Sequence, residues 1–222
     1  MSKHTRKLPW CDITIDGAAG RILVTQKWKY DWLLDTSTTA DTPSAWTDDE
    51  KTAFHANASS AITKAWSRKA TFTVAGESEF AKAYATTSFS LGFQIRHVTA
   101  GSHWKVNVKK AKSEKFLRSN ILWNARIINL DTNDLSSTLK YRSPDNTVLV
   151  YQIPVAHEFG HTIGNVPSLK RGDEYLSSSS HKADHQSILH SGNRLRKRHF
   201  STIDEEIDKV IPDTVFNLKA IS

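Results

Sequence analysis

Two histidines four positions apart lie in a largely apolar part of the chain, residues 148–163. His157 and His161 would project from one face of an α-helix about one turn apart, so both imidazoles could bind the same metal ion. Glu158 is not placed to be a further ligand beside them, but it could accept a proton from a water molecule on the metal. The apolar residues that would anchor such a helix in a core are Ile153, Val155, Phe159 and Ile163. This segment therefore predicts a buried helix that binds a metal.

Pro154 limits where that helix begins, because proline has no N–H to donate inside a helix. It either occupies the first turn of a helix that begins near Gln152 or bends a longer helix. We predict a long helix over 148–163 with a bend at the proline.

Gly164 follows His161 by three residues and extends the pattern to HExxHxxG. This pattern resembles the metzincin branch of the zincins, a group of zinc metallopeptidases, in which the glycine turns the chain toward a third zinc ligand three residues further on. The resemblance implies a Zn²⁺ cofactor, His157 and His161 as ligands, Glu158 as the catalytic residue and hydrolysis of a peptide bond. In this chain the expected position of the third ligand is Pro167, which cannot bind zinc.

A catalytic zinc site needs three protein ligands and an open position, so a residue after Gly164 must provide the third. We predict Asp173, because Gly172 lets the chain bend toward the metal and because some zincins use an aspartate as this ligand. Glu174 is the closest competitor, and only one of these two neighbours would face inward from an extended segment. The more distant alternatives, which we expect to be ordinary polar residues, are His181, Asp184, His185 and Glu205.

A second resemblance covers residues 184–192, DHQSILHSG. In metzincins a tight turn that carries a methionine runs beneath the zinc, and Ser, Ile, Met and a later Gly are common there in this order. Leu189 holds the methionine position, and since Leu and Met have similar volumes, an apolar floor could survive the change. Tyr175 and His199 are candidate hydrogen-bond donors to the oxyanion of a peptide hydrolysis, although a packing role is the stronger interpretation of each.

The segments Gly172–Tyr175 and Arg194–Phe200, with the helix and the aromatic strands upstream, resemble metallopeptidase toxin domains of bacterial secreted effectors. That resemblance implies a protein or peptide substrate, and a cognate immunity protein or a secretion-machine carrier as partner. It also implies a protein that is cytoplasmic before export and is then secreted or delivered into a target cell. The sequence has neither the apolar run of a secretory signal nor a stretch long enough to span a membrane, so neither is expected.

Charge leaves two other functions open. The 222 residues include 30 Lys and Arg against 23 Asp and Glu, a net charge of +7. A basic nucleic-acid-binding module is one alternative, with phosphate contacts from Arg194, Arg196, Lys197 and Arg198. No recognition motif accompanies these cations, so we do not expect nucleic acid as a partner. A zinc-bound interaction protein without catalysis is the other alternative, because the third ligand and the methionine both depart from the metzincin pattern.

The whole sequence predicts one α+β domain over 1–222 with a zincin-like arrangement: an antiparallel or mixed sheet with a backing helix over 1–147, and the active-site helix with a small C-terminal subdomain over 148–222. Thr47 and Glu50 form a capping box for a helix that ends near Ser67. Strands are expected over 21–30, 69–74, 88–99, 103–109 and 120–130, with 88–99 and 103–109 paired as a hairpin. Loops are expected over 35–44, 131–147 and 165–193, and a last helix, capped by Ser201, over 202–210. Cys11 is the only cysteine, so no internal disulfide can form.

Overall fold

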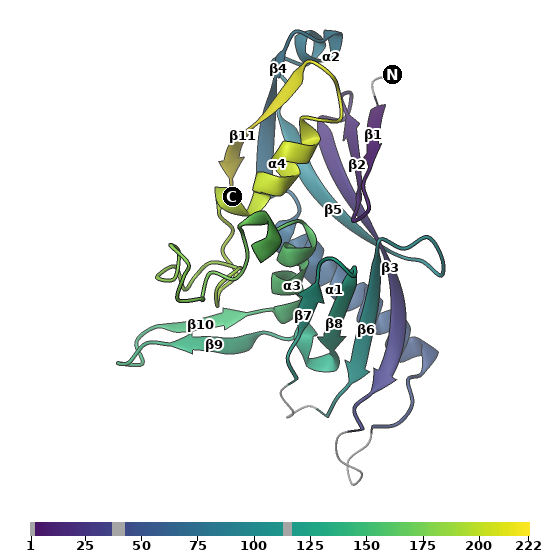
Figure 1. Cartoon of the computed structure of the whole chain (residues 1–222), viewed down its shortest axis with the longest axis vertical. Coiled ribbons are helices and arrows are strands. Elements are labelled where there is room, and N and C mark those ends of the chain that lie inside the picture. The colour runs from purple at the N-terminus through teal and green to yellow at the C-terminus, as the bar shows by residue number, and fades with distance from the viewer. Residues whose placement is uncertain (1–2, 37–42, 113–116) are drawn as a thin grey trace.

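The computed structural model describes residues 3–36, 43–112 and 117–222 (Figure 1). Its strands are β1 (Lys3–Lys7), β2 (Asp12–Asp16), β3 (Arg21–Leu34), β4 (Ala70–Gly76), β5 (Phe89–His97), β6 (Trp104–Lys110), β7 (Asn120–Leu122), β8 (Ile127–Asp131), β9 (Thr138–Arg142), β10 (Leu149–Gln152) and β11 (Thr214–Ile221). Its α-helices are α1 (Asp48–Trp66), α2 (Glu79–Ala83), α3 (Pro154–Thr162) and α4 (Ser201–Ile207), and its short 3₁₀-helices are η2 (Thr132–Leu135), η3 (Pro167–Leu169) and η4 (Lys197–Phe200). The predicted α+β class with a mixed sheet is confirmed.

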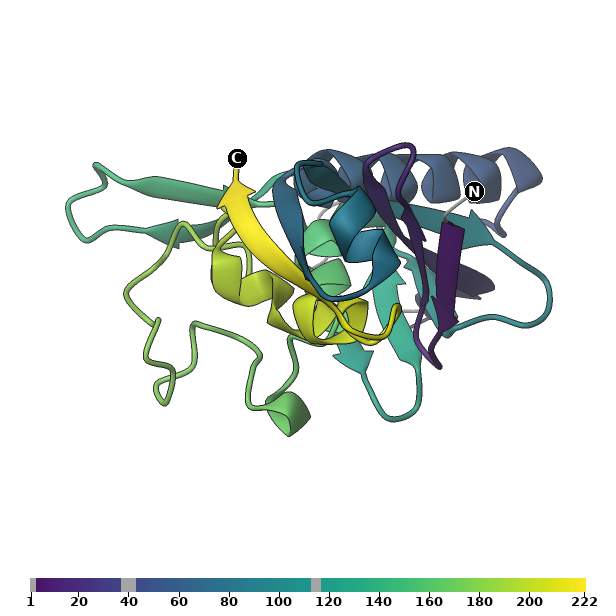
Figure 2. The same ribbon diagram turned by 90° about the horizontal axis from the view of Figure 1, so that it is seen from above.

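Nine strands of the described chain form one sheet, in the order β11-β4-β5-β3-β6-β8-β7, with β1 paired to β2 and β2 to β3. β3 is the longest strand, and it pairs in parallel with β5 along its first half and with β6 along its second half. Every second residue of β3 from Ile22 to Tyr30 is buried, as expected for a strand with one face on a core. β9 and β10 form a separate hairpin that extends away from the body of the molecule (Figure 2).

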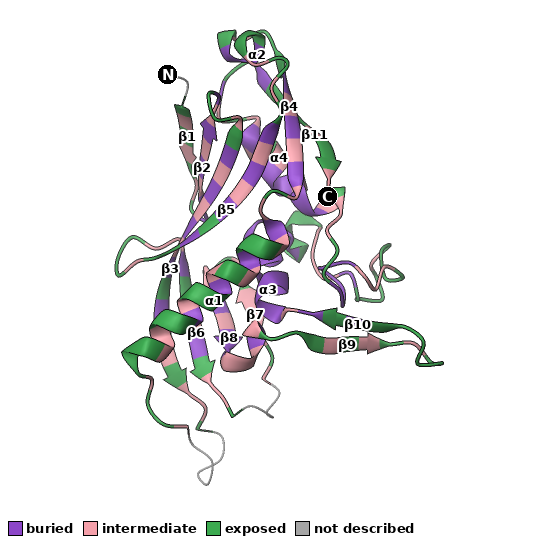
Figure 3. Cartoon of the chain, turned by 180° about the vertical axis from the view of Figure 1, so that it is seen from behind, coloured by how far each residue is buried: buried purple, intermediate pink, exposed green. Residues whose placement is uncertain are grey.

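α1 crosses one face of the sheet (Figure 3). It begins with the predicted capping box: the Thr47 side chain accepts a hydrogen bond from the Glu50 N–H, and the Glu50 carboxylate accepts one from the Thr47 N–H. Each of these bonds satisfies an N–H that has no partner within the helix. The residues that recur every four positions and are buried are Phe54, Ala58, Ile62 and Trp66. The helix therefore backs the sheet, as predicted.

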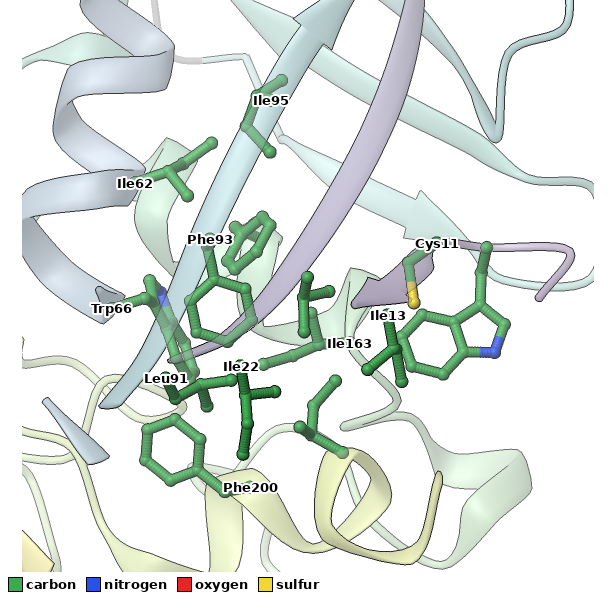
Figure 4. Packing of buried hydrophobic residues seen from close by; sticks show 14 of the residues in the cluster. Cys11, Ile13, Ile22, Ile62, Trp66, Leu91, Phe93, Ile95, Ile163 and Phe200 are labelled. Atoms are coloured by element: carbon green, nitrogen blue, oxygen red, sulfur yellow. The ribbon is translucent and has the colours of Figure 1, made fainter. Parts of the chain in front are cut away.

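Trp66, at the end of α1, joins the sheet to the later part of the chain (Figure 4). Its ring lies 6.3 Å from that of Phe93 in β5, 5.8 Å from that of Phe159 in α3 and 5.7 Å from that of Phe200, measured between centroids. Its Nε1–H donates a hydrogen bond to the carbonyl of Ala156, also in α3, at 2.9 Å. These contacts fix α3 against α1 and the sheet.

Two strand predictions are wrong, one in its pairing and one in its extent. β5 and β6 do not form the predicted hairpin, because they lie on opposite edges of β3 and both run parallel to it. The connection between them crosses β3, where the N–H groups of Val98 and His103 donate to the carbonyls of Trp28 and Lys27. Residues 120–130 are two antiparallel strands, β7 and β8, around a turn in which Arg126 has a φ of 55°. Alternation of apolar residues marks a strand but does not choose its partner, which is why the pairing of β5 and β6 was mispredicted.

The long helix predicted over 148–163 is also wrong. β10 occupies its first part and pairs with β9, which lies in the predicted loop over 131–147 together with η2. α3 begins at Pro154, where a proline costs the helix no hydrogen bond. The last helix, α4, is shorter than predicted and begins at Ser201, whose side chain does not cap it.

β11 was not predicted, and it pairs with β4, so the sheet takes strands from both sides of residue 148. The loop predicted over 35–44 includes 37–42, which lie outside the described residues, whereas 165–193 is largely irregular, as predicted. No helix in the described ranges is long and apolar enough to cross a membrane.

Candidate metal centre

α3 is short, and all nine of its residues are buried. His157 and His161 lie one turn apart on it, with ring centroids 4.9 Å apart. Gly160, between them, faces the core: a Cβ there would lie 2.8 Å from Leu189 and 2.9 Å from the Trp66 ring. Only glycine allows this approach, so the packing side of α3 is closed by Trp66 and Leu189, while the opposite side presents the two imidazoles.

The chain leaves α3 through Gly164, which has a φ of 99° and whose Cβ would meet Thr202 at 2.4 Å. It returns through Gly172, which has a φ of 147°, and the next residue is Asp173. Positive φ values of this kind favour glycine strongly. The two glycines therefore shape the loop that brings a carboxylate back to the histidines.

Three ligand atoms converge at this point. The Nε2 atoms of His157 and His161 are 3.3 Å apart, and Oδ1 of Asp173 lies 3.2 Å from the first and 3.1 Å from the second. Ligand atoms at 2.0–2.1 Å from a tetrahedral zinc are about 3.3 Å from one another, by the geometry of the tetrahedron. In the described residues this is the only group of three or more His, Cys, Asp and Glu side chains with the spacing of a metal site.

The second ring nitrogens explain why these atoms can act as ligands. Nδ1 of His157 lies 2.7 Å from the carbonyl of Ile188, and Nδ1 of His161 is hydrogen-bonded to the carbonyl of Asn165. A carbonyl can only accept, so each Nδ1 carries a proton, and Nε2 is the atom of each ring that can offer a lone pair to a metal. Three atoms that each carry a lone pair repel one another within about 3.3 Å unless a cation or a proton lies between them. Two imidazole nitrogens and one carboxylate oxygen are a set of ligands that suits zinc.

Electrostatics at the centre favour a positive charge. Burial lowers the pKa of His161, but the hydrogen bond to Asp173 and the nearby Glu158 raise it by more, to about 9. Burial raises the pKa of Asp173, but its hydrogen bonds with His157 and His161 lower it by more, to well below the ordinary range. The centre therefore holds a carboxylate that attracts either a proton or a metal cation.

The turn at 187–192 lies beneath this centre. Gln152 donates hydrogen bonds from Nε2 toward the carbonyls of Ile188, His190 and Gly192, at 3.0, 3.2 and 3.3 Å. A Cβ at Gly192 would lie 2.2 Å from the carbonyl oxygen of Gln186, so the turn closes only with glycine there. The turn thus holds the Ile188 carbonyl that orients His157, and the buried Leu189 packs against α3 at Gly160.

Glu158 lies on α3 beside the ligand group but outside it. It is 7% exposed and opens on a cavity of about 780 Å³, which His157 also lines. Burial raises the pKa of Glu158, and the nearby histidines counter this only in part. A carboxyl group with a raised pKa is a better proton acceptor at neutral pH than an ordinary one, which suits a general base.

Tyr175 supports the third ligand. Its hydroxyl donates a hydrogen bond to Oδ2 of Asp173 at 2.8 Å, leaving Oδ1 directed at the histidines. The residue is 43% exposed and lines the same cavity as Glu158. Tyr175 therefore orients a predicted ligand, and because its single hydroxyl hydrogen is donated to Asp173, the predicted role of an oxyanion donor has no support from this geometry.

Glu174 points away from His157 and His161. Its carboxylate accepts hydrogen bonds from Nε and a terminal nitrogen of Arg198, at 2.6 and 2.8 Å, and lies 3.2 Å from Nε2 of His199. His199 is 1% exposed, and its Nδ1 accepts a hydrogen bond from the N–H of Arg196. Its two nitrogens are thus used within the fold, so the predicted oxyanion role of His199 has no support, and its packing role does.

The other alternative ligands lie elsewhere. His181 is exposed, His185 stacks on Tyr141 with ring centroids 3.8 Å apart, and Glu205 forms an ion pair with Arg171. Asp184 pairs with Arg196 and Arg198. None of the four joins the ligand group. Because Asp184 pairs with Arg196 and Arg198, two of the four basic residues predicted to contact phosphates in the nucleic-acid alternative are already in ion pairs.

We expect Asp173→Ala to lower zinc affinity by more than about 100-fold, because loss of a ligand should cost more than loss of a partner that only orients one. Glu174→Ala should leave zinc affinity within about threefold of the wild type, since Glu174 contacts Arg198 instead. Zinc titration against a competing chelator measures both. The reverse ranking would move the third ligand to Glu174.

Asp131 and Asp134 are cavity residues that the sequence interpretation missed, since they lie in a segment predicted as loop. The Asp131 side chain caps η2, and Oδ2 of Asp134 accepts the Asp131 N–H at 2.8 Å. Burial, together with the charge of Asp131, raises the pKa of Asp134 to about 7. The DxxD spacing after an apolar strand is a capping signal that could have located both residues.

The raised pKa of Asp134 predicts a pH effect on stability. The folded protein binds this proton more tightly than the unfolded chain, whose carboxyl has the ordinary value of 3.8, so ionisation lowers the free energy of unfolding as the pH rises from about 4 to about 7. We expect Asp134→Asn to be more stable than the wild type at pH 7, by on the order of 4 kcal/mol at most, and equal to it near pH 4. Urea unfolding at both pH values measures this, with Asp49→Asn as the exposed control. An unchanged difference across this pH range would contradict it.

Comparisons of the chain with models of protein families, with curated proteins and with solved structures returned no match. The resemblances to metzincins and to effector toxins therefore depend on the sequence patterns alone.

Proposed function

We propose that this protein is a zinc-dependent metallopeptidase that hydrolyses peptide bonds. The observation that carries the proposal is the position of Glu158: a buried carboxylate in a cavity wall, next to three side chains whose acceptor atoms have the spacing of zinc ligands. A purely structural metal site needs neither an adjacent carboxylate nor an open cavity. This combination favours catalysis over a zinc-bound interaction protein.

Zinc bound by His157, His161 and Asp173 would supply Lewis acidity, which would polarise a peptide carbonyl and make water a stronger acid. Glu158 accepts the proton of the attacking water and passes it to the nitrogen of the leaving amine. His157 and His161 would hold the metal, and the hydrogen bonds of their Nδ1–H groups to backbone carbonyls fix the orientation of the two rings. Tyr175 keeps Asp173 in place, because its hydroxyl donates its one hydrogen to Oδ2 of that carboxylate.

An extended peptide fits the surroundings of the cavity. β7 is the last strand of the large sheet, and the residues that precede it, Leu117–Ser119, line the cavity. Thr138 and Lys140 of β9 line it as well. An edge strand offers unpaired N–H and C=O groups to an added strand, so a peptide backbone can be held by main-chain hydrogen bonds near Glu158.

The experiment is hydrolysis of a mixed peptide library by the zinc-loaded protein, read by mass spectrometry. We expect new amino termini at defined positions, loss of cleavage on chelation and recovery on adding zinc. One bound zinc per chain without cleavage of any peptide would instead support the non-catalytic alternative. Binding to DNA with a steep dependence on salt would support the nucleic-acid alternative.

We further propose that the peptidase acts as a bacterial effector toxin, with delivery into a target cell and an immunity protein as partner. The toxin-like segments Gly172–Tyr175 and Arg194–Phe200 support this proposal. Expression of the wild type in a bacterial cytoplasm should stop growth, and the Glu158→Gln variant should not. Equal growth of both strains at equal protein levels would contradict it.

A further inference from the structure

The cavity beside Glu158 has a second wall of different chemistry. His157 and Glu158 of α3 line one part of it, and Asp131 and Asp134, at the end of β8 and in η2, line another. α3 packs against η2, so both walls belong to one region of the fold. The two aspartates are only 3% and 4% exposed, although they line the cavity.

Neither aspartate has an ion-pair partner within the part of the chain that the structure describes. Ser119 Oγ and the Asp131 N–H donate hydrogen bonds to Oδ2 of Asp134, at 2.6 and 2.8 Å. Its Oδ1 accepts no hydrogen bond from any described residue. Carboxylates buried to this extent are normally paired with a cation, because an unpaired buried charge is costly.

The cations near this wall do not neutralise it. Arg118 and Lys140 also line the cavity, but both are exposed. Burial raises the pKa of Asp131, and the nearby Lys140 counters this only in part. The chain as a whole carries a charge of +7. The negative charge of Asp131 and Asp134 is therefore a local feature and not part of a generally acidic surface.

We propose that Asp134, with Asp131, forms a subsite that receives a lysine or arginine side chain of a peptide bound at Glu158. The proposal rests on the proposed function for its location, because it places the subsite beside the reacting centre. Side chains of an extended peptide alternate between two sides of its backbone, so one of them can enter the cavity while the backbone passes Glu158. An ammonium or guanidinium group there would donate to the free Oδ1 of Asp134 in a short, charge-assisted hydrogen bond.

The first test measures hydrolysis. Fluorescein-labelled alanine-rich peptides that differ only in one Lys, Gln or Glu are digested by the zinc-loaded protein. We expect kcat/KM for the Lys peptide to exceed that for the Gln peptide by about tenfold or more, and the Glu peptide to be the poorest. Asp134→Asn should bring the Lys-to-Gln ratio close to one, whereas Asp49→Asn, the same change at an exposed site of α1, should keep it.

The second test measures binding without turnover. Zinc-loaded Glu158→Gln is titrated with the same peptides, and fluorescence anisotropy gives the dissociation constants. We expect the Lys peptide to bind about tenfold more tightly than the Gln peptide, and the added Asp134→Asn change to remove the difference. Asp131→Asn serves as a second variant if Asp134→Asn does not fold, and circular dichroism and thermal melting check each protein.

The outcomes separate the two proposals. Hydrolysis with no preference for Lys, or a preference that survives both aspartate substitutions, overturns the subsite and leaves the peptidase. Absence of hydrolysis together with a Lys preference in binding that depends on Asp134 overturns the peptidase and leaves the subsite. Equal binding of all three peptides in the second test overturns the subsite whatever the first test gives.

Discussion

Replacement of His157 or His161 by alanine is expected to remove zinc from the protein and to abolish hydrolysis at the same time. The two Nε2 atoms and Oδ1 of Asp173 lie within 3.1–3.3 Å of one another, so each histidine provides one of three protein ligands. Loss of one ligand should weaken binding by more than the roughly 10- to 100-fold that loss of an orienting partner costs. Elemental analysis after dialysis should show zinc falling from about one per chain to near zero.

The matched control is His181→Ala, since His181 is exposed and lies outside the ligand group. That variant should keep its zinc and its activity. Circular dichroism would show whether the α3 variants remain folded, as expected from the core contacts of Trp66 with Phe159. A double variant of His157 and His161 that still bound one zinc per chain would place the metal somewhere else.

Local signals in the sequence predicted the elements that depend on short-range chemistry. The capping box of Thr47 and Glu50 was correct because both hydrogen bonds form within four residues of chain. The alternation over 21–30 located β3 for the same reason. Strand partners were not predictable in this way, because β5 and β6 each pair with β3 through contacts about 70 residues or more away along the chain. β11 was missed altogether, and its position is set by its pairing with β4.

In the candidate centre too, short-range spacing predicted some of the residues, and packing between distant segments places the others. Helical spacing alone placed His157, His161 and Glu158 together, and the expectation that only one of Asp173 and Glu174 faces inward agrees with their contacts, since Asp173 meets His161 and Glu174 binds Arg198. The two groups that shape the cavity were beyond such reasoning. Tyr175 could be singled out but not placed, and the acidic wall depends on η2 packing against α3, a contact between segments that sequence spacing does not join.

The other large effect is expected from Glu158→Gln. This variant should bind one zinc per chain with nearly unchanged affinity and should lose about 10²- to 10⁴-fold in kcat, because the amide cannot take the proton of the attacking water. Glutamine has the shape of glutamate, so the 7% exposed position should accommodate it without a cavity. Burial raises the pKa of Glu158, so the charged carboxylate is less favourable in the folded protein than in the unfolded chain. The neutral glutamine variant should therefore be at least as stable as the wild type.

Stability and metal content together therefore decide what an inactive Glu158→Gln protein means. Unchanged melting with one zinc per chain assigns the lost activity to proton transfer, and the matched exposed change, Glu79→Gln, should leave activity and zinc intact. Loss of zinc in proportion to activity would make Glu158 part of the metal-holding group, against its position outside the three converging ligand atoms. Activity within about twofold of the wild type would require a different base, and Asp134, a cavity residue whose pKa burial raises to about 7, would be the residue to replace next.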